Sequence, residues 1–249
     1  MVISYGKAEI QVLFENDFCL VLNKPAGLPV QGGEGIKSSL DSLLAEKISP
    51  RPFLVHRLDR DTSGVILVAK TKAAAAEFAT LFMPSCKQRG VLKHYLAICS
   101  GVPSPGEGVI RTELDVPLKG QKRVFKKSET SYRTISSASL LSLAAVDNEE
   151  NSSFISFLDL ELGTGRMHQI RRHLAEIGNP VLGDDKYGDF PLNKKLRKII
   201  HLKNLLLHAS ALVIPPLPAL VPEGLDIRAP LPSSFFPFKE LLTIPPLFL

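Results

Sequence analysis

One stretch decides the fold of this chain, His56-Arg57-Leu58-Asp59-Arg60-Asp61-Thr62-Ser63-Gly64. It places two carboxylates and two arginines beside each other, and the apolar run 65–69 follows at once. Charged groups near a core are costly unless they are paired or functional. The pattern therefore predicts a polar turn that enters a buried strand. Asp59 and Asp61 either pair with the neighbouring arginines on a surface turn or carry chemistry.

The composition is that of a globular protein, with 249 residues, 45% hydrophobic and 22% charged. Cys19, Cys86 and Cys99 are widely spaced and lack metal-ligand spacing, so we expect a reduced, cytoplasmic protein without a metal site. No apolar run approaches the roughly 20 residues that a membrane span requires, so no membrane association is expected. The net charge of +5 suits an anionic partner such as nucleic acid.

Hydrophobic periodicity predicts the secondary structure. The predicted strands cover residues 10–14, 18–22, 65–69, 93–99, 130–135, 154–162 and 207–214. The predicted helices cover residues 39–47, 71–82, 167–177 and 193–206, and 117–128 is predicted to be a polar hairpin or loop. Clustered strands with few helices favour an α+β fold with a mainly antiparallel sheet. We expect a single domain over 1–249, in which the apolar tail at 236–249 packs on the body.

A second polar cluster follows the strand predicted at 154–162. Its glycines let that strand turn sharply into a helix N-terminus, where backbone N–H groups favour anions. Arginines there could grip phosphates or hold a carboxylate ionised. Alternatively, Arg166 simply caps a surface strand and His168 starts the helix. The residues in or beside this first turn are Arg166, His168, Gln169 and Arg171.

Two further features have both an ordinary and a functional interpretation. Tyr95 lies in a predicted strand, where a tyrosine is usually a half-buried sheet residue but can stack on a base or accept a proton. A basic run surrounds Phe125, and it suits either a solvated loop or an arm that grips a nucleic-acid backbone. Its members are Lys119, Lys122, Arg123, Lys126 and Lys127.

Together these segments resemble the RluA-type family of pseudouridine synthases. The aspartate stretch 56–64 is similar to the signature that carries the family's catalytic aspartate, and 163–171 is similar to a later signature. Weaker similarities follow the family's order along the chain. They lie at 23–27, 93–97, 180–184, 187–188 and 207–209.

The resemblance implies the pseudouridine synthase fold with a central RNA-binding cleft. It also implies isomerisation of uridine in ribosomal or transfer RNA, without cofactor or metal, by a monomer. Asp59 is implied to be the essential carboxylate, Arg166 its partner, and Tyr95 the residue that contacts the uracil. Arg57 is implied to fill the gap left by a flipped-out base. The other implied substrate-binding residues are Lys24, His56, His168, Gln169 and Arg171.

The sequence departs from the family pattern at two places. Ile214-Pro215-Pro216 stands where relatives often have a His-Pro turn, and the tail beyond Phe235 is more apolar than expected. The chain also begins close to the catalytic body, so no S4-like RNA-binding domain is expected. Two other functions stay open: a non-catalytic RNA-binding protein with the same fold, and an unrelated aspartate-dependent hydrolase. The hydrolase would need a second carboxylate or a metal, for which Asp61 is the near candidate.

Overall fold

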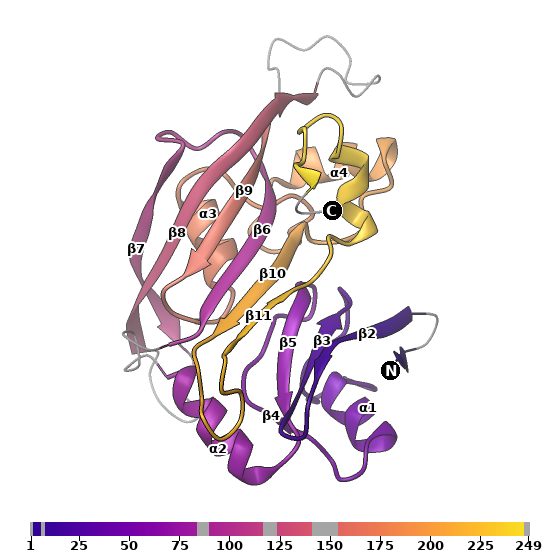
Figure 1. The fold of residues 1–249 in the computed structure, drawn as a ribbon. Helices are drawn as coiled ribbons and strands as arrows, with labels where there is room; N and C mark the ends of the chain where they lie inside the picture. Colours follow the sequence, from indigo (N-terminus) through magenta and orange to yellow (C-terminus); the bar gives the residue numbers. More distant parts are fainter. Residues whose placement is uncertain (1, 6–7, 84–89, 117–123, 141–153, 247–249) are drawn as a thin grey trace. The chain divides into compact units, whose positions relative to one another are not determined.

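The structure is a computed structural model, and it describes residues 2–5, 8–83, 90–116, 124–140 and 154–246. Its contacts divide the chain into two compact units, and each is described here by itself. The first unit comprises residues 1–93 and 208–230, and the second comprises 94–207 and 231–249. Figure 1 identifies the elements of both units along the chain.

The first unit contains a mixed sheet in the order β1-β2-β3-β5-β10. Neighbouring strands are antiparallel except β5 and β10, which run parallel. Every residue of β5 is buried, as the apolar run after the aspartate stretch predicts. The strands are β1 (Val2–Tyr5), β2 (Ala8–Glu15), β3 (Cys19–Lys24), β5 (Ser63–Ala69) and β10 (Leu207–Ile214), with β4 (Phe53–Leu54) beside β5 and β11 (Leu225–Arg228) beside β10.

Two capped helices belong to this unit, α1 (Leu40–Lys47) and α2 (Lys72–Leu81). Ser39 closes a capping box at the start of α1, and the Thr71 side chain accepts from a backbone N–H at the start of α2. Phe78 of α2 is buried in the same core as Leu67 of β5. Both helices confirm the predicted ones to within a residue at each end.

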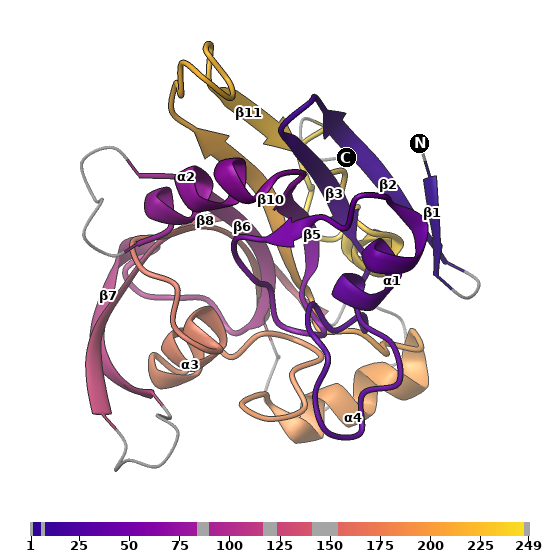
Figure 2. The ribbon, with the colours of Figure 1, turned by 90° about the horizontal axis from the view of Figure 1, so that it is seen from below.

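The second unit contains an antiparallel sheet in the order β6-β9-β8-β7. The helix α3 lies against β7 and β8 (Figure 2). The strands are β6 (Leu92–Ser100), β7 (Glu107–Val116), β8 (Val124–Ser139) and β9 (Phe154–Leu162), and the helices are α3 (Gln169–Glu176) and α4 (Phe190–Ile199).

The core of the second unit contains the described part of the C-terminal tail. Phe238 is completely buried, and Leu242 and Ile244 join the same cluster as Phe157 of β9. A 3-10 helix (Ser233–Phe238) carries the first of these side chains into the core. The described part of the apolar tail thus contributes side chains to the core of the second unit as far as Ile244.

The structure corrects two predicted elements. The helix predicted at 193–206 is α4, which begins after the N-cap Asp189 with a proline in its first turn and ends at Ile199. Soon after it, His201 has a φ of 55°, which a continuing helix does not allow. Of the two alternatives predicted at 117–128, the hairpin is the correct one, since β7 and β8 pair antiparallel up to Val116 and Val124, but its second strand begins inside the predicted range, at Val124. Lys126 and Lys127 are therefore strand residues, whereas Lys119, Lys122 and Arg123 lie outside the described residues.

The predicted fold class is confirmed as α+β, with a mixed, mainly antiparallel set of strands and few helices. The sequence did not predict β1, β4, β7 or β11. Among the described residues, no helix has both the length and the apolar character needed to cross a membrane.

Candidate active site

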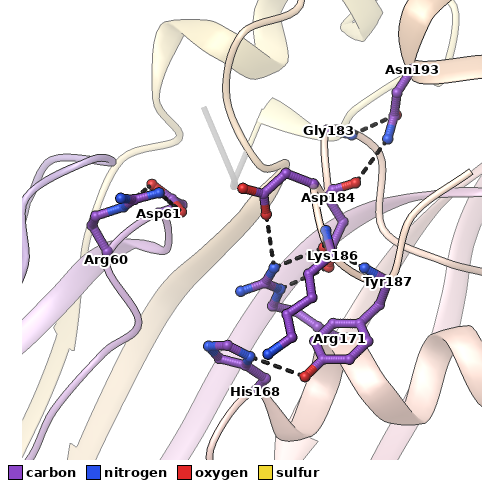
Figure 3. A network of polar contacts seen from close by, with 10 residues as sticks. Arg60, Asp61, His168, Arg171, Gly183, Asp184, Lys186, Tyr187 and Asn193 are labelled. Atoms are coloured by element: carbon purple, nitrogen blue, oxygen red, sulfur yellow. Dashed lines mark hydrogen bonds and ion pairs between the residues drawn. The ribbon is translucent and has the colours of Figure 1, made fainter. Parts of the chain in front are cut away.

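The aspartate turn lies in the first unit, immediately before β5. The N–H of Thr62 donates to the carbonyl of Asp59 at 3.3 Å and so closes the turn. Asp61 accepts two hydrogen bonds from Arg60, at 3.0 and 3.1 Å, in an exposed pair (Figure 3). The surface-turn interpretation therefore holds for Asp61, which has its cation next to it in the chain. The Asp59 side chain is half-buried.

Lys24 supports this turn from inside the first unit. Its side chain is completely buried, and Nζ donates to the carbonyls of Pro25, Leu28 and Arg60, each at 2.9 Å. An ammonium group has three donors, and these three acceptors use all of them. Burial lowers the pKa of Lys24 to about 7, against the attraction of Asp61 and Asp59. We expected Lys24 to bind substrate, but its burial and its three internal bonds assign it to holding the turn.

His56 is also held internally. Its Nε2 accepts from the Leu67 N–H at 2.9 Å, and its ring stacks on Phe82 at 4.4 Å between centroids. Burial, with a smaller effect of Lys93, lowers the pKa of His56 to about 3, so the ring is neutral. The contacts assign His56 to fixing the start of the aspartate turn on β5. Arg57, the next residue, is exposed, and its predicted contact with RNA stays a prediction.

The Ser-Gly end of the turn allows β5 and β10 to lie unusually close. Gly64 has a φ of +111°, and a Cβ there would lie 2.1 Å from the carbonyl oxygen of Ala209. Ser63 Oγ lies 2.8 Å from Nδ1 of His208, whose Nε2 lies 3.3 Å from the Ala229 carbonyl. Because a carbonyl only accepts, Nε2 carries the proton and Ser63 donates to Nδ1. Burial lowers the pKa of His208 to about 4, in keeping with a neutral ring.

The second unit carries Tyr95 and Arg166. Tyr95 is a buried residue of β6, paired with Leu160 of β9. Arg166 is half-buried in the loop 163–168 between β9 and α3, and among the described residues its buried Nε has no hydrogen-bond partner. Asp59 belongs to the first unit, so its predicted pairing with Arg166 stays a prediction, as does the predicted contact of Tyr95 with the uracil.

His168 and Gln169 begin α3. His168 has left-handed backbone angles, φ 52° and ψ 28°, and its Nδ1 lies 3.2 Å from the hydroxyl of Tyr187 (Figure 3). Gln169 is buried, and its amide makes four hydrogen bonds within the unit. The amide of Gln169 is therefore occupied internally, which assigns it a supporting role in place of the substrate contact that we expected.

Arg171 points to an acidic partner inside the second unit (Figure 3). Its Nε and Nη2 donate to the two oxygens of Asp184, both at 2.7 Å, and Nη2 lies 3.3 Å from Asp185. Its side chain is 5% exposed and that of Asp184 0%. Burial alone would raise the pKa of Asp184, but hydrogen bonds from Arg171 and from the N–H groups of Tyr187 and Lys186 hold it below its usual value. This buried pair replaces the phosphate contact that we expected of Arg171.

A metal site is not formed by the residues that the structure describes, since no three of their His, Cys, Asp or Glu side chains group together as ligands. The polar centres that the described residues do form are the aspartate turn of the first unit and the loop before α3 in the second.

Comparison with known proteins decides the family. A model of the RNA pseudouridylate synthase family matches residues 18–176, which include both polar centres. The chain belongs to the RNA pseudouridylate synthase family. Members of this family are isomerases that convert uridine to pseudouridine in RNA.

Curated relatives are similar in sequence to this synthase over most of the length of the chain. It is 34% identical to the ribosomal large subunit pseudouridine synthase C of Rickettsia typhi over 230 residues, which cover 90% of this chain and 69% of the relative. It is 37% identical to the Salmonella typhi protein of the same name over 204 residues. That match covers 81% of the synthase and 60% of the relative, so the chain spans less than two thirds of the Salmonella protein.

Solved structures agree with the predicted fold. The synthase is similar to human RNA pseudouridylate synthase domain containing 4, with a TM-score of 0.70, 28% identity, and coverage of 93% of this chain and 92% of the other. It is also similar in fold to human RNA pseudouridylate synthase domain containing 1, with a TM-score of 0.68 and 24% identity. The pseudouridine synthase fold expected from the sequence is therefore confirmed.

Proposed function

We propose that this synthase isomerises uridine to pseudouridine in ribosomal RNA, with Asp59 as its essential carboxylate and without a cofactor. The observation that carries this proposal is the construction of the aspartate turn. Lys24, Gly27 and Thr62 all bond to its backbone, and His56 and Gly64 fix its two ends on β5. The turn is held by its backbone, and Asp59 is left half-buried at its centre.

The choice of ribosomal RNA is supported by the names of the relatives, which are ribosomal large subunit enzymes. Transfer RNA is the other substrate that the sequence suggests. In either RNA the target base must leave its stack, at a cost of about a few kcal/mol. In this proposal Arg57 of the turn replaces the base, and Lys126 and Lys127 on β8 contact phosphates; the exposure of all three side chains supports these roles.

The reaction itself is an isomerisation and needs no other reactant. The bond between N1 of the uracil and C1′ breaks, C5 bonds to C1′, C5 loses its proton, and N1 takes up a proton, so the product has the composition of the substrate. Asp59 in its ionised form serves as the nucleophile or base of this reaction. Tyr95 contacts the uracil and accepts the C5 proton, and Arg166 pairs with the carboxylate.

The test uses the two aspartates of the same turn, which are separated by one residue. Asp59→Asn should abolish tritium release from RNA that carries C5-labelled uridine, and RNA binding should persist. Asp61→Asn, which removes an exposed pair with Arg60, should retain most of the activity. Turnover by Asp59→Asn would refute the role of Asp59, and equal losses in both variants would show that the turn as a whole, not one carboxylate, had been damaged.

The substrate is tested separately in cells. Carbodiimide mapping with primer extension would compare total RNA from a strain lacking this protein with RNA from its parent. We expect pseudouridine to disappear from large-subunit ribosomal RNA. A loss confined to transfer RNA would refute the ribosomal assignment and retain the reaction.

A further inference from the structure

A chain of buried polar side chains runs from the loop before α3 into the β7–β8 hairpin, all within the second unit. We call it the His173 network. It begins at the backbone N–H of Arg166, which donates to Oε1 of Gln169 at 3.0 Å. The other side chains of the network are Thr164, Thr130, His173 and Ser128.

The far end of the His173 network determines the position of every proton in it. Ser128 Oγ donates its one hydrogen to the Thr112 carbonyl at 2.7 Å, because a carbonyl can only accept. Ser128 must therefore accept from Nε2 of His173, which lies 2.8 Å away, and the Thr112 hydroxyl oxygen is a second, more distant acceptor for the same N–H at 3.3 Å. This places the proton of a neutral His173 ring on Nε2, so Nδ1 accepts from the Thr130 hydroxyl at 2.9 Å.

The near end follows from the same reasoning. Thr130 has given its hydrogen to His173, so its oxygen accepts from Nε2 of Gln169 at 3.0 Å. The second hydrogen of that amide goes to the Glu129 carbonyl at 2.8 Å. The Gln169 oxygen accepts from the Thr164 hydroxyl at 2.6 Å and from the Arg166 N–H. All the donors in the network point one way, and each has an acceptor.

The side chains of the His173 network are also shielded from solvent. His173 and Thr130 are completely buried, and Gln169 and Ser128 are 3% exposed. Burial, together with the charge of Arg172, lowers the pKa of His173 to about 4, so the neutral ring that the hydrogen bonds demand is the form present at neutral pH. Arg172 adds a second tie from α3 to the hairpin, through a 2.6 Å ion pair with Asp115 of β7.

We propose that Gln169, Thr130 and His173 are positioning residues. They attach the loop 163–168, which carries Arg166, to the strand β8, and the rate of the isomerisation depends on this attachment. The inference rests on the proposed function of Arg166. No member of the network needs to touch RNA. Its effect is transmitted through the backbone N–H of Arg166 and the side chain of Thr164, and the chemistry is sensitive to such small displacements.

Thr130 offers the sharpest test, because its hydroxyl can be replaced by a methyl group in one variant and kept in another. Thr130→Val keeps the shape but separates Gln169 from His173, and Thr130→Ser keeps the hydroxyl. The matched control is Thr134→Val on the same strand, whose buried hydroxyl has no hydrogen-bond partner among the described residues. At saturating RNA and below the unfolding temperature, we expect Thr130→Val to lower the single-turnover rate about tenfold to a hundredfold. Thr130→Ser and Thr134→Val should stay near wild type.

Two further measurements separate positioning from a general loss of stability. Hydrogen exchange of the segment 163–169 should be faster in Thr130→Val than in Thr134→Val. In a double-mutant cycle, adding Thr130→Val to Arg166→Ala should cost much less than it costs in the wild type, because the two changes act on one loop. A wild-type rate or wild-type exchange in folded Thr130→Val would overturn the inference, and so would fully additive effects.

Failure of the proposed function would look different. If Asp59→Asn retained turnover, the catalytic assignment would fail, but the exchange of segment 163–169 would still report whether the His173 network holds the loop. Unchanged exchange in Thr130→Val would refute the network alone.

Discussion

Lys24 Nζ and the backbone carbonyl of Arg60 are joined by a 2.9 Å hydrogen bond inside the first unit. The acceptor belongs to the residue that follows Asp59, and the same carbonyl also accepts from the Gly27 N–H. The turn after β3 and the aspartate turn therefore share one acceptor. A lysine that looks in sequence like a substrate contact instead connects two loops through their backbone.

Replacing this lysine should damage both stability and activity. Lys24→Met leaves the Pro25 and Leu28 carbonyls without their ammonium donor and leaves the Arg60 carbonyl with the Gly27 N–H alone, and each unsatisfied buried group costs about 1–3 kcal/mol. We expect a fall of about 2 kcal/mol or more in the free energy of unfolding, measured by urea denaturation. Lys70→Met is the control, since it removes only the surface pair with Glu15 and should cost less than about 1 kcal/mol. Equal effects of the two changes would contradict the supporting role of Lys24.

Adding one carbon at Gly64 should prevent the close contact of β5 with β10. In Gly64→Ala the new Cβ would lie 2.1 Å from a backbone oxygen of Ala209, and the φ of +111° is unfavourable for any L side chain. We expect loss of soluble, folded protein, or destabilisation by more than about 3 kcal/mol. Gly32→Ala has open space around its Cβ and should be close to neutral in the same thermal melts.

The two arginines beside the start of α3 should fail in different ways. Arg171→Met leaves the buried Asp184 without its ion-pair partner, which typically costs about 3–5 kcal/mol. Arg166→Lys should keep the wild-type stability but lose most of its activity, because an ammonium group cannot reproduce the bidentate geometry of a guanidinium. Melting curves and single-turnover rates on both variants separate these outcomes. A folded but inactive Arg171→Met beside an active Arg166→Lys would transfer the pairing with Asp59 to Arg171.

Acid should destabilise the protein through its buried histidines. Burial lowers the pKa of His173 and of His208 to about 4, whereas in an unfolded chain the value is near 6.5. The unfolded state then binds more protons between these two values. The contribution of these two histidines to stability is therefore complete above about pH 6.5, falls as the pH decreases towards about 4, and becomes constant below that. Between pH 7 and pH 5 each histidine should account for about 2 kcal/mol.

The histidine prediction can be checked by urea unfolding at these two pH values. His173→Gln cannot titrate, so its loss of stability on acidification should be smaller than that of wild type by about 2 kcal/mol. His201→Asn is the control, since His201 is exposed and asparagine tolerates its positive φ. An undiminished acid response in His173→Gln would contradict the neutral, buried ring.

A helix or strand was predicted correctly where residues close to it in the sequence determine its position. The strands β5, β9 and β10 are long apolar or alternating runs, and α1 and α2 carry side-chain caps, so local pattern sufficed. The helix α4 was misplaced because its proline belongs to its first turn. The start of α3 was predicted two residues early, since nothing in the sequence shows that His168 adopts a left-handed conformation.

The candidate site was predicted less evenly, for a different reason. The motifs correctly located the polar turns, but Lys24, Gln169 and Arg171 turn inward to partners distant in sequence, such as Asp184 for Arg171. Whether a polar side chain faces solvent or a buried acceptor depends on the packing of other strands. The sequence therefore indicated which segments matter but could not tell a residue that touches substrate from one that supports it.

The parallel contact of β5 with β10 has a consequence for how the molecule is made. Gly64 pairs with Ala209, and everything that forms the second unit's sheet is synthesised between them. While the ribosome extends the chain, the strand that follows Asp59 has an unfilled edge until β10 emerges. The first segment to be translated therefore waits for more than a hundred further residues before its own sheet is complete, and such long-range closure is slow. A nascent chain stalled before residue 207 would carry the whole aspartate motif and still lack the strand that locks it in place.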